Sequence, residues 1–449
     1  MTRLQKYRIL VMGLFLISFS GLMVCGYLYL KDQVPDSILV EEGEEIPVIF
    51  QEPYHSLIEE ETLEAGSRSV SDIPSEALHL SGDSAGSAGT SLWNSVTTFF
   101  SCLGNYNQKD GYGEGNSTEA VKCTLLGIIP LKTVEVERTS RQKVYAGGFP
   151  VGIYLETRGI LVIGTGEVEG IDGQTYEPAE HIVESGDYII SADGRILETK
   201  EELVECINAS GGKKICLEVL RDGEELNLEV TPVQAAGAEY KAGIWVRNDA
   251  QGVGTLTYTD ENGSFGALGH GISDVDTNTL LTLKEGKLYE ADVAFVTKGV
   301  KGKPGELAGV IHYRDSALLG TIEENRITGI YGTAENELKM ESGQEYEIGY
   351  KQEIEKGPAT ILCSVDGSIK EYAITIESID LNKREVNKGM VIRVTDLELL
   401  EKTGGIVQGM SGSPILQNGR IVGAVTHVFV NDPTKGYGIF IENMLDAVG

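Results

Sequence analysis

The feature that most constrains this chain is an uncharged stretch near its start, Ile9–Leu30, which runs for 22 residues. As a helix, it is long enough to cross a hydrocarbon core of about 30 Å. Arg3, Lys6 and Arg8 precede it, whereas Asp36–Ala65 holds ten acidic residues and no Lys or Arg. Because basic flanks stay on the cytosolic side, we expect residues 1–31 to be an anchor with a cytosolic N-terminus and the bulk of the chain to be exported. A cleaved signal peptide is the competing interpretation.

Residues 32–121 are dominated by Glu, Ser and Gly, and we expect them to form an acidic flexible tether. A segment of about 90 residues is too long for an ordinary loop of a compact domain. An exposed tether is also where a protease would cut. The net charge of −31 argues against a nucleic-acid partner.

From Lys122 onward the chain consists of short runs rich in Val, Ile and Thr between glycines, which predicts a mainly β protein. One stretch is especially clear. "DYIIS" predicts a strand, and Thr199 with Glu202 three residues later predicts a capped helix. Asp222 and Gly223 predict the turn of a hairpin in "KICLEVLRDGEELNLEV".

This order of elements, together with "SGDYIISADG", resembles a PDZ domain over about residues 140–233, within a segment 122–233 that opens with strands. One departure is His181, where such domains usually carry glycine. The resemblance implies that a peptide adds as a strand and rests its carboxylate on a glycine-containing loop. "PVGIYL" is the matching stretch, so Gly152 and Ile153 are the predicted peptide-binding residues. A PDZ-like domain that acts only as an internal spacer is the alternative.

Residues 234–449 hold many further strand-like runs and almost no helical pattern, which predicts a sandwich or a barrel. Within them, "GMSGSP" places Ser411 in a tight turn. A serine nucleophile needs a base, and it needs amide donors aimed at the oxyanion. Gly409 permits backbone angles that turn its own amide and that of Ser411 toward one point. A plain turn is the other interpretation of this motif.

The base must be one of six histidines. His270 lies between two glycines and precedes Ser411 by 141 residues, the order found in chymotrypsin-like enzymes. His427 follows Ser411 by 16 residues, where it would shape a specificity pocket or simply pack. Asp274, Asp276 and Asp396 are candidates for orienting the imidazole, and spacing alone does not choose among them. The chain has six cysteines, and none shows the paired spacing of a zinc site or of a disulfide framework. We therefore expect no metal or other cofactor.

The nucleophile turn resembles that of chymotrypsin-like serine proteases, although Met410 stands where trypsin-type enzymes hold an aspartate. "GALGHGISD" and the block from "VTDLELLEKTGG" to "IFIENML" resemble the stage IV sporulation protein B family, membrane-anchored serine peptidases of endospore-forming bacteria. The resemblance covers about residues 120–449 and maps the catalytic triad of that family onto His270, Asp396 and Ser411. It thereby favours Asp396 over Asp274.

The same resemblance implies a peptidase in the space between the forespore and mother-cell membranes. Such a peptidase cleaves itself in its N-terminal region. It then cuts the exported part of a membrane regulator that restrains an intramembrane metalloprotease, and a late sigma factor is released. The rival hypothesis is a non-enzymatic, membrane-tethered PDZ adaptor. His270 and Ser411, both in glycine-rich settings, argue against it.

Overall fold

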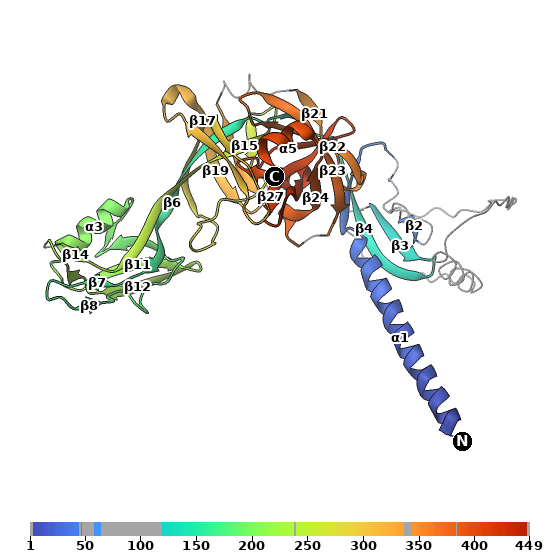
Figure 1. Ribbon diagram of the computed structural model, residues 1–449, viewed down its shortest axis with the longest axis horizontal. Coiled ribbons are helices and arrows are strands. Elements are labelled where there is room, and N and C mark those ends of the chain that lie inside the picture. The colour runs from blue at the N-terminus through green and yellow to red at the C-terminus, as the bar shows by residue number, and fades with distance from the viewer. Residues whose placement is uncertain are drawn as a thin grey trace. The chain divides into compact units, whose positions relative to one another are not determined.

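The computed structural model describes residues 3–44, 46, 58–63 (backbone only), 119–237, 239–335, 344–382 and 384–446. They belong to two compact units (Figure 1). The first is Met1–Arg141 with Asp380–Asn382, and the second is Gln142–Ile379 with Lys383–Gly449. Most of the predicted tether, including His55 and His79, lies outside the described residues.

The first unit combines a long helix with a four-stranded sheet. Helix α1, Arg3–Gln33, has no buried residue, and it is long and apolar enough to cross a membrane, a property that it shares with signal sequences. The sheet has the order β1-β4-β3-β2. In β1 alternate residues such as Ile38 and Val40 are buried, the two-residue period of a strand with one covered face. The four strands are β1 (Ser37–Glu41), β2 (Ile58–Leu63), β3 (Glu119–Leu125) and β4 (Ile129–Thr139). The predicted tether therefore contains two strands, β1 and β2, which pair with the later strands β4 and β3.

Six antiparallel strands of the second unit close into a first barrel. The ring runs β6-β15-β16-β20-β19-β17, and β17 pairs back with β6. Val151, Leu256, Phe265 and Leu288 fill its core. The strands are β6 (Pro150–Thr165), β15 (Ile244–Thr259), β16 (Ser264–Ala267), β17 (Leu283–Thr297), β19 (Leu318–Arg326) and β20 (Gly329–Ala334).

A second barrel follows in the chain. It is closed in the order β22-β23-β24-β28-β27-β26, and Ile374, Ile415 and Val425 are among its buried residues. Two six-stranded antiparallel barrels in succession confirm the predicted chymotrypsin-like fold. The strands are β22 (Gly357–Ser364), β23 (Ile369–Ile379), β24 (Met390–Val394), β26 (Pro414–Gln417), β27 (Arg420–Phe429) and β28 (Asp432–Phe440).

The PDZ-like part has the predicted local structure. Thr199 and Glu202 form the capping box at the start of α3, with each side chain accepting from the other residue's backbone amide at 3.3 Å. His181 has a φ of 59°, in the left-handed region that glycine adopts most readily, which explains why glycine is usual there. The elements are β9 (Tyr188–Ala192), β10 (Arg195–Ile196), α3 (Lys200–Ala209), β11 (Ile215–Arg221) and β12 (Glu224–Val230).

Two long strands join this PDZ-like part to the first barrel. The first half of β6 pairs with β17 inside the barrel, whereas Ile160 and Leu161 in its second half pair with β9. Strand β15 accompanies β6 along both halves, with register shifts near Trp245 and Arg247. The PDZ-like part thus lies in the chain between the first two strands of the barrel, and β6 belongs to the peptidase ring although it precedes residue 234.

This topology corrects one expectation about the peptide-binding loop. Gly152 pairs with Val253 on one side and with Tyr289 on the other, and Ile153 belongs to the barrel core. A Cβ on Gly152 would lie 2.3 Å from a methyl carbon of Ile311. The glycine is therefore needed for close packing within the barrel, and both residues lie in that barrel, away from any loop of the PDZ-like part.

The remaining elements are short connections. Strand β25 pairs in parallel with β18 and leads into the turn that carries Ser411. The remaining strands are β5 (Lys143–Ala146), β7 (Val168–Glu169), β8 (Thr175–Tyr176), β13 (Val233–Gln234), β14 (Tyr240–Lys241), β18 (Gly305–Ile311), β21 (Glu345–Glu347) and β25 (Val407–Gln408). The remaining helices are α5 (Leu397–Thr403), α6 (Ile441–Leu445) and the 3₁₀ helices Asp315–Ala317, Lys351–Glu353 and Val386–Lys388.

Candidate active site

A cavity of about 470 Å³ is lined by residues of both barrels. The first barrel contributes His270, in the loop after β16, and the second contributes Ser411, in the turn before β26. His427 and Gly409 also line it. The two side chains predicted to act as base and nucleophile, 141 positions apart in the sequence, therefore share one cavity.

The Ser411 turn depends on two glycines in the left-handed region. Gly409 has a φ of +95° and Gly412 a φ of +96°, which side chains rarely permit. A Cβ on Gly412 would lie only 2.1 Å from the carbonyl oxygen of Thr255. The turn thus requires glycine on both sides of Ser411, and for Gly412 the reason is close contact with the first barrel.

Thr255 of β15 holds the nucleophile turn and the histidine loop together. Its amide donates to the Ser411 carbonyl at 3.0 Å, and its hydroxyl donates to the Gly409 carbonyl at 2.7 Å. Its own carbonyl accepts from the amide of Leu268, two residues before His270, at 3.2 Å. Thr255 was not predicted, because a threonine within a strand-like run carries no sequence signal of such a role.

Two backbone amides of the turn remain available for an anion. Among the described residues, no acceptor is bonded to the amides of Gly409 and Ser411. The neighbouring amides are engaged: those of Met410, Gly412 and Ser413 donate to the carbonyls of Val407, Val425 and Met410. The pair of unengaged amides beside a hydroxyl is the composition of an oxyanion hole.

His270 is oriented by its own loop. Its Nδ1 lies 2.8 Å from the Gly271 carbonyl, and since a carbonyl only accepts, this nitrogen carries the proton. The lone pair is then left on Nε2, the atom that a general base must present. Burial lowers the pKa of His270 below its ordinary value of 6.5, with the bond to Gly271 opposing the shift. The imidazole is therefore neutral at pH 7.

Ser411 is in a resting arrangement. Its hydroxyl donates to the Thr426 carbonyl at an Oγ–O distance of 2.6 Å, and so its proton is directed toward the backbone of β27. For the hydroxyl to direct this proton to His270 instead, the Ser411 side chain must rotate away from the Thr426 carbonyl.

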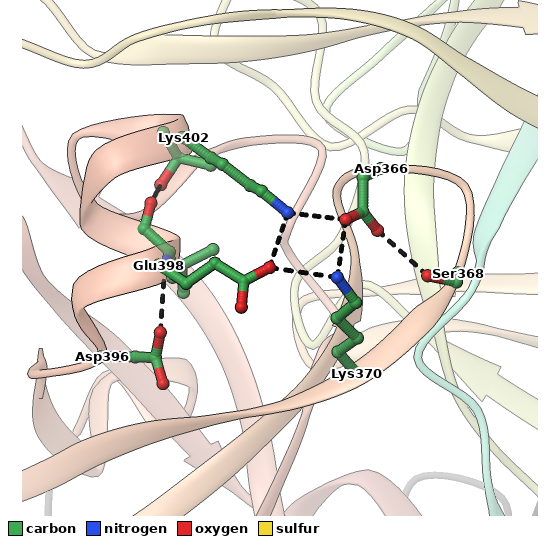
Figure 2. Close-up of polar contacts among 8 residues, drawn as sticks. Asp366, Ser368, Lys370, Asp396, Glu398 and Lys402 are labelled. Carbon is green, nitrogen blue, oxygen red and sulfur yellow. Dashed lines mark hydrogen bonds and ion pairs between the residues drawn. The ribbon is translucent and has the colours of Figure 1, made fainter.

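Asp396 is not among the residues that line the cavity. It is the N-cap of α5, where its carboxylate accepts from the Leu399 amide at 3.0 Å (Figure 2). A second, longer contact at 3.4 Å comes from the Ala373 amide. The other two candidate carboxylates, Asp274 and Asp276, are paired with Arg247. The structure thus brings His270 and Ser411 together and does not bring Asp396 to them.

A network of charges next to Asp396 ties α5 to the second barrel. Figure 2 shows Lys370 and Lys402 each lying between Asp366 and Glu398, with nitrogen–oxygen distances of 2.6 to 3.0 Å. These lysines hold the pKa of Asp366 far below its usual range. Asp396 takes no part in these ion pairs and bonds only to the backbone.

His427 lies beside His270. The imidazole rings of His270 and His427 have centroids 4.9 Å apart, and both line the cavity. Burial lowers the pKa of His427 to about 4, and the positive charges on protonated His270 and on Lys388 act in the same direction. Its Nδ1 is buried without a hydrogen-bond partner among the described residues.

The family comparison decides what kind of domain this is. The family model described as SpoIVB peptidase S55 matches residues 238–445. This region is a SpoIVB peptidase S55 domain. It includes His270 and Ser411 but not β6, the barrel strand that precedes the PDZ-like part. The chain is accordingly a peptidase with a serine-protease fold, and the adaptor hypothesis is set aside.

Solved structures give weaker likenesses. The PDZ domain of an SdrC-like protein from Listeria monocytogenes is 16% identical, with a TM-score of 0.16, and 20% of this chain and 87% of that chain are covered. The inactive form of the Rv3671c protease of M. tuberculosis is 12% identical, with a TM-score of 0.27, and 44% of this chain and 84% of that chain are covered. The HtrA-type protease AlgW with a decapeptide is 13% identical, with a TM-score of 0.26, and 45% of this chain and 53% of that chain are covered. No curated protein matches the chain.

No metal centre accompanies the S55 site in the described part of the chain, where no cluster of three or more His, Cys, Asp or Glu side chains could hold an ion. Two contributors beyond Thr255 escape sequence analysis, the carbonyls of Gly271 and Thr426, because a backbone group has no signature of its own.

Proposed function

We propose that the S55 domain hydrolyses peptide bonds through an acyl-enzyme formed on Ser411. The observation that carries this proposal is the shared cavity of His270 and Ser411, with two unengaged amides in the same turn. His270 acts as general base and then as general acid, and the amides of Gly409 and Ser411 bind the oxyanion.

The reaction proceeds in two halves. Ser411 rotates away from the Thr426 carbonyl, gives its proton to Nε2 of His270 and attacks the substrate carbonyl carbon. The resulting oxyanion accepts hydrogen bonds from the two amides. His270 then donates the proton to the leaving amine as the C–N bond breaks, which leaves an ester on Ser411. In the second half, His270 deprotonates a water that attacks this ester, and the proton returns to Ser411.

The Gly271 carbonyl is assigned the orienting role that the family resemblance gives to Asp396. It lies 2.8 Å from Nδ1 of His270, whereas the Asp396 carboxylate is bonded to the amides of Leu399 and Ala373. A carbonyl fixes the tautomer as a carboxylate does, but it adds no negative charge to stabilise the imidazolium. This makes His270 and Ser411 a dyad.

Replacing Asp396 by asparagine tests this assignment. Asparagine is as good an N-cap as aspartate, so we expect both the stability of the protein and kcat/KM to remain within about threefold of wild type. An orienting carboxylate would instead cost about 10⁴ in kcat. Asp396→Ala removes the cap and should lower the free energy of unfolding by about 1 kcal/mol without changing kcat. Thermal unfolding and peptide hydrolysis of the two variants measure these effects.

We further propose that the chain cleaves itself in its N-terminal region. It would then cut the exported part of a membrane regulator that restrains an intramembrane metalloprotease, so that a late sigma factor is released. The resemblance to the sporulation peptidase family supports this substrate. Helix α1 is long enough to hold the chain in a membrane, with a cytosolic N-terminus and the bulk between the forespore and mother-cell membranes.

Covalent labelling tests the catalytic assignment. A fluorophosphonate should react with Ser411, as located by mass spectrometry, and His270→Ala should abolish the reaction. Because the pKa of His270 is lowered, the neutral base persists below pH 6.5, and the labelling rate should fall only below that pH. A decline centred above pH 6.5, or labelling that His270→Ala leaves unchanged, would contradict the assignment.

A further inference from the structure

The cavity beside Ser411 is built to receive a substrate side chain without a net charge. Of the described residues that line it, none is Asp, Glu, Lys or Arg. One wall is aliphatic and comes from the segments around the nucleophile turn and the end of β27, with Ile406, Val407, Val428 and Val430. A charged side chain entering this space would lose its hydration and find no counter-ion, which is costly.

His427 is one of the polar residues that line this cavity, with Gln251, Ser273 and Gln408 among the others. It follows Thr426, whose carbonyl accepts the Ser411 hydroxyl, and both Ser411 and His427 line the cavity. Its distance to the His270 ring, 4.9 Å between centroids, places it beside the reacting atoms. A side chain that enters the cavity while its own carbonyl is held at Ser411 therefore meets His427.

The buried ring nitrogen indicates which proton His427 carries. Nδ1 has no partner among the described residues, and a buried N–H without an acceptor is rarer and more costly than a buried lone pair. The proton therefore belongs on Nε2, which leaves the ring one N–H donor for the cavity. A donor of this kind is satisfied by a carbonyl oxygen.

The charge state of His427 separates a carboxamide from a carboxylate. Burial lowers its pKa to about 4; protonated His270 and Lys388 contribute to the shift, and Glu385 opposes it. At pH 7 the ring is neutral, so it donates a hydrogen bond without offering a positive charge. A substrate carboxylate would remain an uncompensated buried anion, whereas an amide carbonyl would be matched.

We propose that His427 selects a carboxamide side chain, glutamine or asparagine, at the substrate residue whose carbonyl Ser411 attacks (P1). This inference rests on the proposed function, because it needs Ser411 as the nucleophile. The bond from Nε2 to the side-chain carbonyl forms in a cavity whose described lining residues carry no formal charge apart from the titratable histidines. A P1 side chain without a carbonyl oxygen leaves the Nε2–H of His427 unpaired, and this cost discriminates against such substrates.

Randomised peptide mixtures that differ only in a fixed P1 residue test the proposal on the purified full chain at pH 7. Mixtures with Gln or Asn should be cut roughly tenfold or more faster than those with Glu, Lys or Leu. In His427→Leu the rate on the Gln and Asn mixtures should fall roughly tenfold or more, while the rate on the Leu mixture stays within a few-fold. The control is His312→Leu, because His312 pairs with Asp292 and does not line the cavity.

Fluorophosphonate labelling of Ser411 is measured on the same samples. Labelling with an unchanged P1 preference in His427→Leu, or a wild-type preference for Glu, Lys or Leu, overturns the inference and leaves the proposed function standing. Absence of both labelling and cleavage in wild type overturns the proposed function and this inference with it. Should His427→Leu fail to fold, the wild-type P1 profile decides alone.

Discussion

Replacing Ser411 by alanine is expected to lower kcat for peptide hydrolysis by roughly 10⁶-fold and to abolish cleavage in the N-terminal region. The variant removes the atom on which the acyl-enzyme is proposed to form but leaves the cavity and the backbone amides of residues 409 and 411 in place. It also removes one hydrogen bond to the Thr426 carbonyl, so the free energy of unfolding should change by only about 1 kcal/mol. Single-turnover kinetics and mass spectrometry of the amino-termini measure the two effects.

Ser413→Ala is the matched control for this experiment. Ser413 lies in the same turn, fully buried, and its hydroxyl has no hydrogen-bond partner among the described residues. Loss of that hydroxyl should leave kcat unchanged and should not destabilise the protein, because no bond is lost. Self-cleavage that persists in Ser411→Ala at the wild-type rate would assign the nucleophile to another group.

The parts of the fold that local rules govern were predictable from the sequence. The capping box of Thr199 and Glu202 and the turn at Asp222–Gly223 depend on a few consecutive residues, and the structure has both. The shared cavity of His270 and Ser411 was predictable for a different reason. Each lies beside glycines in a strand-rich context, and acyl transfer requires a base and a hydroxyl in one place.

The topology was not predictable in the same way, because it depends on pairing between distant segments. Strand β6 is one continuous run of strand-forming residues, yet its first half pairs within the barrel and its second half pairs in the PDZ-like part. Gly152 illustrates the consequence: a glycine in "PVGIYL" suits a ligand loop or a close contact equally well. Only the approach of Ile311 decides between them.

The position of Asp396 in the structure follows its local helix-capping pattern and not the orienting role that the family resemblance implies. "TDLELL" places an aspartate directly before an apolar helical turn, which is the pattern of an N-cap, and the carboxylate has that role in the structure. The group that does hold His270 is a carbonyl, which every residue possesses. Sequence analysis therefore identifies the side chains of this site better than the backbone atoms that orient them.

Replacing Gly409 by alanine is expected to lower kcat by about 10²- to 10³-fold, the usual effect of losing one oxyanion donor, with KM changed little. The φ of +95° is unfavourable for alanine, and its Cβ would lie 2.9 Å from that of Leu307, so the peptide must rotate and its amide leaves the oxyanion. Gly419→Ala is the matched control, since Gly419 has a φ of +76° in the turn before β27 with open space around its Cβ. Both variants should lose about 1 to 2 kcal/mol of stability, whereas only Gly409→Ala should lose turnover. Equal turnover in the two variants would remove the Gly409 amide from the mechanism, and the oxyanion would then need another donor beside Ser411.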